Sequence, residues 1–344
     1  MKKRATIYDI AKALGITIST VSRALNNSDL ISATTKDSVL RMAKQLDYRP
    51  NRLASSLSSG KTYIIGVIVP SAEIHFFSSF VSSLEVEFKR AGYSILLYQS
   101  NESFQSEENG VTTLLEAQVD GLIISPSLAT TNFKHLERLH QENKPLLVFD
   151  RTDNRIAAPQ VGIDDEKAGY LAASHLVQAG YQRIAFVSTA SEITIFKNRF
   201  EGYLRALKQF KIPFDSSLVV RKGMSIDAGI SGTNELLKLS RRPDAIIGGD
   251  DFTALGILNA LSKAGIQPPE IGVVGFANQL FSAYITPSLT TIDQQATKMG
   301  AESAKLFLTM LQSASPQEMA EKRVVLEPIL ITRNTTSLEK QVLD

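Results

Sequence analysis

The chain has 344 residues, of which 43% are hydrophobic and 21% are charged, and it contains no cysteine. This length predicts two or three globular domains, and no apolar run approaches the ~20 residues that a membrane-spanning helix needs. The composition therefore excludes a helical membrane protein, and the lack of cysteine excludes disulfide bonds, thiolate metal sites and cysteine nucleophiles.

The first sixty residues differ in charge from the rest of the chain. They contain ten Lys and Arg against four Asp and Glu, whereas the remaining 284 residues contain 27 against 31. A basic module on a mildly acidic body is typical of a protein that binds nucleic acid, because neutralising phosphates supplies most non-specific affinity. A solvated basic tail is the alternative. Asp9 and Lys12 interrupt the apolar stretch that a signal peptide requires, so we expect a cytoplasmic location.

Three amphipathic helices are predicted in this basic segment. Apolar residues recur at helical spacing in three groups: Ile7, Ile10, Ala11 and Leu14; Val21, Ala24 and Leu25; Val39, Met42, Ala43 and Leu46. Thr6 and Thr17 are suited to cap the first two helices, and Gly15 ends the first. Thr34 or Thr35 can start the third.

Two short helices joined by a tight turn, with a third behind them, form a helix-turn-helix, whose second helix enters the major groove of DNA. Short polar groups and an arginine on that helix can reach base edges or phosphates. The side chains placed to do so are Ile18, Ser19, Thr20, Ser22, Arg23 and Asn26. A plain three-helix bundle with a polar surface is the alternative interpretation.

Four stretches of this segment carry distinctive motifs: Thr6–Ala11, Gly15–Thr17, Thr20–Asn26 and Tyr48–Asn51. They closely resemble the motifs of the lactose/galactose repressor (LacI/GalR) family. The resemblance implies that the segment reads operator DNA. It adds Thr6, Tyr8 and Thr17 to the expected DNA contacts.

Residues 51–59 are predicted to form a short, serine-rich helix. A helix of less than three turns is marginal in water, so this one needs a partner helix or DNA to stay formed. The resemblance implies a hinge helix in which Leu57 wedges between base steps in the minor groove. The expected DNA contacts of this segment are Asn51, Leu53, Ala54 and Leu57. A solvated linker whose leucines pack on the following domain is the alternative; Ser55 stands where family members often have arginine.

From Tyr63 onward, short apolar runs alternate with amphipathic helices, which predicts repeated βαβ units and doubly wound parallel sheets in an α/β fold. The expected strands are 64–69, 94–98, 121–125 and 146–150, then 184–188, 218–221, 245–249 and 273–276, with terminal strands within 324–332. Runs without alternation predict strands buried on both faces. Because the pattern starts again part-way, we expect two similar lobes.

Ligands of open α/β sheets bind outside the carboxyl ends of the strands, so two facing lobes predict a cleft at their junction. Ser71, Asp150 and Asp250 follow predicted strands, and Asp164 follows a crossover. Such groups suit a hydroxyl-rich ligand. Helix capping is the alternative for Asp164, Asp165 and Asp251, and it is the interpretation we prefer for Asp251.

The body also resembles the periplasmic sugar-binding-protein-like core of the same repressors. The matching stretches are Asp120–Ile123, Gly162–Asp164, Arg199–Tyr203, Asp251–Gly256 and Pro287–Ile292. The resemblance implies effector contacts at Phe76, Phe77, Asp164, Arg199, Asp250 and Gln294. Arg199 is the foremost of these, with an exposed ion pair to Glu201 or Glu192 as its alternative. Ala277 stands where many relatives have a ligand-binding aspartate, which Asn278 can replace.

The expected domains are 1–49 (helix-turn-helix), 50–61 (hinge), 62–333 (effector binding and dimerisation) and a loose tail at 334–344. Lobe 1 is expected at about 62–161 and 293–326, and lobe 2 at about 162–292 and 327–333. The predicted function is effector-controlled transcription regulation by a homodimer on a pseudo-palindromic DNA operator, with no cofactor and no membrane partner. The alternatives are a solute-binding protein of a transport system and an α/β enzyme, although the usual nucleotide-binding and hydrolase motifs are absent.

Overall fold

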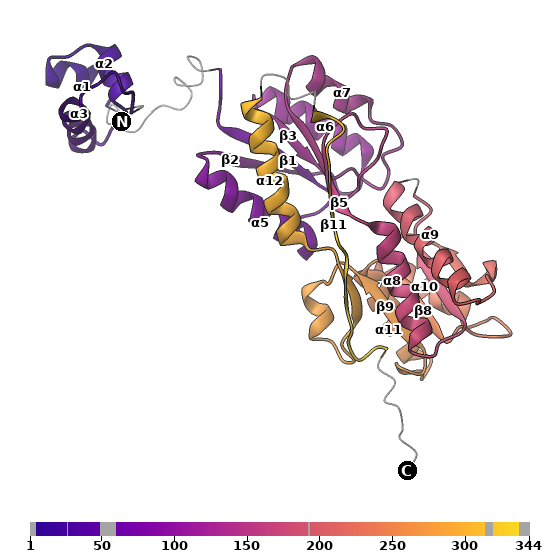
Figure 1. The fold of residues 1–344 in the computed structure, drawn as a ribbon. Helices are drawn as coiled ribbons and strands as arrows, with labels where there is room; N and C mark the ends of the chain where they lie inside the picture. The colour runs from indigo at the N-terminus through magenta and orange to yellow at the C-terminus, as the bar shows by residue number, and fades with distance from the viewer. Residues whose placement is uncertain (1–4, 26, 49–59, 192, 314–318, 337–344) are drawn as a thin grey trace. The chain divides into compact units, whose positions relative to one another are not determined.

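The computed structural model describes residues 5–25, 27–48, 60–191, 193–313 and 319–336. The chain divides into two compact units, residues 1–62 and 63–344, which we call the headpiece and the core (Figure 1). The predicted hinge segment, 51–59, lies outside the described residues.

The described part of the headpiece contains three helices. Its helices are α1 (Ile7–Leu14), α2 (Ile18–Leu25) and α3 (Ala33–Gln45). They surround a small apolar centre in which Ile10, Val21 and Val39, one from each helix, are fully buried. The predicted caps of the first two helices are confirmed: Thr6 forms a capping box at α1, and the Thr17 hydroxyl oxygen accepts a hydrogen bond from the Thr20 backbone N–H at 3.2 Å.

The predicted start of the third helix was wrong. Helix α3 begins at Ala33, and Ser32 is its N-cap, with its hydroxyl oxygen accepting a hydrogen bond from the Thr35 backbone N–H at 3.2 Å. Thr34 and Thr35 therefore lie in the first turn. Three hydroxyl residues within four positions, Ser32, Thr34 and Thr35, fit a cap equally well in sequence, and only the backbone geometry selects among them.

The core contains two α/β lobes, each with a six-stranded sheet. Lobe 1 has strands β1 (Ile64–Val69), β2 (Ser94–Gln99), β3 (Leu122–Ile124), β4 (Leu146–Phe149), β5 (Gln160–Ile163) and β11 (Arg323–Leu326), and helices α5 (His75–Arg90), α6 (Phe104–Glu116), α7 (Lys134–Gln141) and α12 (Ala296–Gln312). Lobe 2 has strands β6 (Ile184–Ser188), β7 (Val219–Arg221), β8 (Ala245–Gly248), β9 (Gly272–Phe276), β10 (Thr290–Asp293) and β12 (Ile329–Ile331), helices α8 (Asp165–Gln178), α9 (Thr194–Gln209), α10 (Ile226–Leu236) and α11 (Asp251–Lys263), and 3₁₀ turns η1 (Ser216–Leu218) and η2 (Leu280–Ala283).

The two sheets share one strand order. It runs β11-β5-β4-β3-β1-β2 in lobe 1 and β12-β10-β9-β8-β6-β7 in lobe 2. All pairs are parallel except β12, which runs antiparallel to β10. The chain passes between the lobes after β5, after β10 and between β11 and β12. The predicted doubly wound α/β fold with two lobes is therefore confirmed.

Helices cover both faces of each sheet. In lobe 1, Val67 of β1 packs into one apolar cluster with α5 and α12, whereas the neighbouring Ile68 packs into another with α6 and α7. Lobe 2 has α8 and α9 on one face and α10 and α11 on the other. The first cluster continues from α5 and α12 into α8 and α9, so the lobes share one hydrophobic core.

Two expectations about local burial were wrong. Strand β2 is not buried on both faces, because it lies at the edge of its sheet, where Leu96 and Leu97 are each 39% exposed. The start of the predicted loose tail is held in place: Thr335 and Thr336 are buried, and Thr335 bonds the Val273 carbonyl at 2.7 Å. None of the helices in the described part of the chain has both the length and the apolar character of a membrane-spanning segment.

Candidate effector site and DNA-reading surface

The carboxyl ends of the strands place several charged side chains at the junction of the lobes. Asp150 follows β4 of lobe 1 and is 7% exposed. Its carboxylate accepts a hydrogen bond from the Gln294 amide, just after β10, at 3.1 Å. Burial raises the pKa of Asp150, while the charges of Arg151 and Arg199 oppose the increase. The structure thus brings together Asp150, Gln294 and Arg199, three of the predicted effector residues.

Arg199 enters this group from α9 and is 3% exposed. Its Nε donates to the Asp165 carboxylate at 2.8 Å and its Nη1 to the Gly249 carbonyl at 3.2 Å, and the guanidinium carbon lies 4.7 Å from the centre of the Phe276 ring. An exposed ion pair with Glu201 is therefore wrong; Glu192 lies outside the described residues. Burial raises the pKa of Asp165 to about 7, against the lowering effect of Arg199.

Lobe 1 contributes a second buried arginine, Arg151, which follows Asp150 at the same strand end. The Arg151 guanidinium binds both carboxylate oxygens of Glu102 at 2.7 Å, and Nη1 also donates to the Pro126 carbonyl at 2.8 Å. It lies 5.8 Å from the centre of the Phe77 ring. Sequence reasoning missed Glu102, because nothing local marks a glutamate 49 positions from its partner.

The aspartates predicted as caps have divided roles. Asp164 caps α8, accepting from the Lys167 N–H at 2.8 Å, and Asp250 caps α11, accepting from the Thr253 N–H at 2.7 Å. The capping role preferred for Asp251 was wrong. Asp251 is fully buried and accepts hydrogen bonds from the Gln279 N–H at 2.7 Å and the Thr291 hydroxyl at 2.6 Å.

Asp165 is likewise no cap, because its carboxylate binds Arg199. In each Asp-Asp pair the first residue caps the helix and the second is turned into the protein.

The remaining predicted effector residues lie at the sides of this junction. Phe76 and Phe77 are buried on the first turn of α5, edge to face at 5.1 Å. Asn278 follows β9, and its side-chain oxygen accepts from Arg333 at 2.8 Å. Phe76 and Asn278 line one pocket of about 370 Å³, whereas the Ser71 hydroxyl bonds its own loop at the Glu73 N–H.

Direct contacts also join the two lobes. The Ser191 hydroxyl donates to the Leu128 carbonyl at 3.0 Å, and the Thr194 hydroxyl donates to the Asp153 carboxylate at 3.1 Å. Leu128 packs against the apolar start of α9 at Phe196. Sequence reasoning found none of these residues, because each lies in a loop or a helix start with no pattern of its own.

The headpiece presents most of its predicted DNA contacts on its surface. Tyr8 is 66% exposed, and Arg23 is also exposed. The other exposed or half-buried members of the set are Thr6, Thr17, Ser19, Thr20 and Ser22. Ile18 is half-buried and packs against the headpiece centre. The predicted contacts outside the described residues are Asn26, Asn51, Leu53, Ala54 and Leu57.

Comparison with known proteins decides the family. Residues 62–335 match the model of periplasmic binding proteins and the sugar-binding domain of the LacI family, and residues 6–51 match the model of bacterial regulatory proteins of the LacI family. The chain belongs to the LacI family. It is a DNA-binding transcription regulator with an effector-binding core, as the motifs of both regions predicted.

Relatives of this LacI-family chain match it along almost its whole length. The transcriptional regulator DegA of Bacillus subtilis is 30% identical over 336 residues, covering 97% of this chain and 98% of DegA. The transcriptional repressor PurR of Vibrio atlanticus is 28% identical, covering 96% and 98%. Because the match includes the helix-turn-helix region, it overturns the alternative of a solute-binding protein.

Solved structures of LacI-family regulators superpose on the chain. The lac repressor dimer bound to operator and the anti-inducer ONPF is 27% identical, covers 98% of this chain and 100% of its own, and has a TM-score of 0.83. The cellobiose complex of the transcriptional regulator CelR is 25% identical, covers 96% and 100%, and has a TM-score of 0.72.

Proposed function

We propose that this LacI-family regulator is a homodimeric repressor whose affinity for a pseudo-palindromic operator is controlled by a sugar or sugar derivative bound between the lobes of the core. One observation carries the effector site. Arg199 is anchored through Nε and Nη1, and its Nη2 has no hydrogen-bond partner among the described residues. A guanidinium fixed in this way offers planar donors to hydroxyl or carboxylate oxygens of a ligand.

The proposed effector contacts are the predicted ones: Ser71, Phe76, Phe77, Asp150, Asp164, Arg199, Asp250, Asn278 and Gln294. This site contains both carboxyl groups and arginine side chains, and burial raises the pKa of the carboxyl groups of Asp150 and Asp250. Such a mixture of donors and acceptors suits a ligand with several hydroxyl groups. Backbone conformation supports the placement: Asp150, Ala277 and Asn278 have φ values of 59°, 98° and 47°, and such strain in non-glycine residues concentrates at ligand sites.

The class of effector is proposed from two kinds of support. The lac repressor and CelR structures hold ONPF and cellobiose respectively, each in a protein of the same fold. Ala277 provides no carboxylate after β9, and the neighbouring Asn278 is bound to Arg333 and Asp293. An acidic or phosphorylated sugar therefore fits this side of the site better than in relatives that have aspartate there.

The proposed DNA-reading set is the predicted one, with α2 in the major groove and the 51–59 segment as hinge. The proposed domain limits remain 1–49, 50–61, 62–333 and 334–344, with the lobe ranges given above. Val86, Leu96 and Leu97 on α5 and β2 are apolar and 39–48% exposed, which supports dimerisation through the core. A protein of this kind acts where the chromosome is, in the cytoplasm, and regulates without catalysing a reaction.

Selection of binding sites from random duplex DNA, followed by affinity measurements at a fixed salt concentration, tests the DNA half of the proposal. We expect Arg23→Ala to lose discrimination between the selected site and random DNA. Arg41→Ala is the matched control, because Arg41 is another exposed headpiece arginine, on α3, and is paired with Asp37 at 2.7 Å. Absence of any preferred sequence for the wild-type protein contradicts the proposal.

A thermal-shift screen of sugars and sugar phosphates, repeated on variants, tests the effector half. We expect the Tm increase caused by the best ligand to disappear in Arg199→Ala. It should persist in Arg205→Ala, which removes an exposed arginine of the same helix that pairs with Glu166. A ligand shift that survives Arg199→Ala unchanged contradicts the proposed site.

A further inference from the structure

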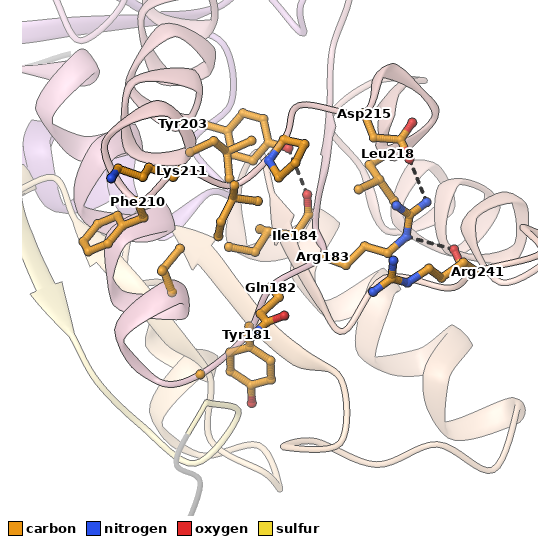
Figure 2. Close-up of a pocket in the computed structure, with 15 residues that line it drawn as sticks. Tyr181, Gln182, Arg183, Ile184, Tyr203, Phe210, Lys211, Asp215, Leu218 and Arg241 are labelled. Carbon is orange, nitrogen blue, oxygen red and sulfur yellow. Dashed lines mark hydrogen bonds and ion pairs between the residues drawn. The ribbon is translucent and has the colours of Figure 1, made fainter.

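A second pocket lies in lobe 2 at the end of the sheet opposite the lobe junction (Figure 2). It has a volume of about 570 Å³, within the usual range for small-molecule sites. It is bounded by the C-terminal ends of α8 and α9, the first residue of β6 and the segment leading to β7. None of the proposed effector residues lines it.

The floor of this pocket is apolar. Ile184, Leu207 and Leu218 are at most 3% exposed, and the buried ring of Tyr203 lies beside them. The Tyr203 hydroxyl donates to the Ile184 carbonyl at 2.9 Å, and the Tyr181 hydroxyl donates to the Pro269 carbonyl at 2.8 Å. Both phenol protons are donated to backbone carbonyls, so the floor offers no hydroxyl donor to a ligand, and an apolar ring can lie on it without leaving a polar group of its own unpaired.

The rim of the pocket is cationic. Arg183 forms an ion pair with Asp215 at 2.8 Å, and the two charges nearly cancel. Arg183 also donates a hydrogen bond to the Arg241 carbonyl at 3.0 Å. Lys211 and the Arg241 side chain have no ion-pair partner among the described residues, and both are exposed. Figure 2 shows Lys211 on one side of the pocket and Arg241 on the other. The surplus charge favours an anionic ligand.

The two helices that end at this pocket begin at the effector site. Helix α8 carries Asp165 in its first turn, and α9 carries the Arg199 that binds it. The helices are in backbone contact: a Cβ on Gly169 would lie 1.9 Å from the Arg199 carbonyl oxygen, and one on Gly202 would lie 1.9 Å from that of Glu166. Such close packing transmits strain from one helix to the other.

We propose that this pocket is a second small-molecule site, which binds an organic acid with an apolar ring, and that occupancy shifts the α8–α9 pair and so changes the effector site. The ring lies on the apolar floor, and the carboxylate is held by Lys211 or Arg241. The binding half stands independently of the proposed effector site, whereas the transmission half rests on it.

Isothermal titration of the full chain with benzoate, phenylacetate and indole-3-acetate tests the binding half. We expect saturable binding of at least one acid, and at least tenfold weaker binding of its neutral amide. The variant Lys211→Glu/Arg241→Glu should weaken binding of the acid at least tenfold. The control Lys208→Glu/Arg242→Glu changes charge equally at neighbouring exposed positions outside the pocket and should stay within twofold.

Three results would each overturn the binding half: no saturable binding of any of the acids, equal affinity for acid and amide, or equal affinity in the two double variants. Loss of acid binding in Arg199→Ala but not in Lys211→Glu/Arg241→Glu would place the acid between the lobes and overturn it too.

Operator affinity measured with and without saturating acid tests the transmission half. We expect at least a threefold change in the wild type and none in Lys211→Glu/Arg241→Glu. A change in neither protein overturns transmission. A protein that binds the acid but no operator instead rejects the proposed function and leaves the second site standing.

Discussion

Each lobe contributes one buried arginine to the lobe junction, Arg151 after β4 of lobe 1 and Arg199 from α9 of lobe 2, yet the two side chains differ in the donors that they leave available. Arg151 of lobe 1 is bound to both oxygens of Glu102 and to a carbonyl. Arg199 of lobe 2 gives one N–H to Asp165 and one to Gly249. The first is a clamp within its lobe, and the second retains donors for a ligand. The hydrogen-bond partners of each arginine, rather than the residue type, therefore decide whether the side chain only stabilises its lobe or can also bind a ligand.

The lobes also differ in how their helices approach each other. In lobe 2, α8 and α9 touch through backbone atoms at Gly169 and Gly202. In lobe 1, α5 and α12 meet more loosely, since a Cβ on Gly300 would lie 2.6 Å from the Phe80 carbonyl oxygen. Aromatic side chains fill the space between these helices, and the ring centres of Phe88 and Phe307 are 6.0 Å apart. Lobe 2 is therefore the stiffer connection to the effector site.

The largest expected effect comes from removing each arginine. Arg199→Ala should lower the free energy of unfolding by about 3–5 kcal/mol at pH 8, because it leaves Asp165, 4% exposed, as an unpaired buried charge. Arg151→Ala should cost less, about 1–3 kcal/mol, because Glu102 is 32% exposed and can be hydrated. Asp150, whose carboxylate lies 3.9 Å from Arg151 Nε, keeps the charge of Arg199 and the hydrogen bond of Gln294. Urea denaturation measures both, and equal losses would contradict the distinction between the lobes.

The helix contacts give the next effect. Gly202→Ala should destabilise the protein by about 3 kcal/mol, since the new methyl group meets backbone atoms that cannot rotate away. Gly300→Ala should cost about 1–2 kcal/mol, because part of its clash is with the movable Ser83 side chain. Thermal and urea unfolding of the two variants compare them directly. A larger loss of stability for Gly300→Ala than for Gly202→Ala would contradict the conclusion that α8 and α9 form the stiffer pair.

Buried carboxyl groups of lobe 2 predict a pH dependence. Burial raises the folded-state pKa of Asp165 to about 7 and that of Asp251 to about 8. Between about pH 4 and these values the folded protein holds protons that the unfolded chain has released, so stability should fall as pH rises, by at most about 1.4 kcal/mol per pH unit for each group.

The pH effect can be assigned with one isosteric change. Asp251→Asn should flatten the decline between pH 5 and 8, because the amide cannot ionise and can still bond Gln279 and Thr291. Asp215→Asn is the exposed control, since the hydrogen bonds of Ser217 and Arg183 lower the pKa of Asp215 and remove it from this window. Urea unfolding at four pH values measures the slopes; parallel profiles for wild type and Asp251→Asn would reject the assignment.

The smallest expected effect concerns the contacts between the lobes. Ser191→Ala and Thr194→Val each remove one cross-lobe hydrogen bond and should cost about 0.5–1.5 kcal/mol of stability. Because each bond forms only when the lobes touch, both variants should also change effector affinity several-fold. Titration of the best ligand from the thermal-shift screen measures this. Unchanged affinity in the double variant would show that these bonds do not bias closure.

Much of this molecule was readable from local patterns. Helical periodicity and Gly15 predicted the headpiece helices, and short apolar runs separated by amphipathic helices predicted the two lobes. The motifs identified the family, and the position of Asp150 at a strand end predicted that it lies at the lobe junction. These features depend on neighbours a few positions away, which the order of residues specifies directly.

Long-range partners were decided by the tertiary structure alone. Nothing near Arg199 in sequence selects Asp165, 34 positions away, and nothing near Ser191 selects Leu128, 63 positions away. Strand β2 reads as a buried run, yet it lies at the edge of its sheet, because among the described residues it pairs with β1 alone. Which groups meet depends on packing and strand order, and these exist only once the whole chain has folded.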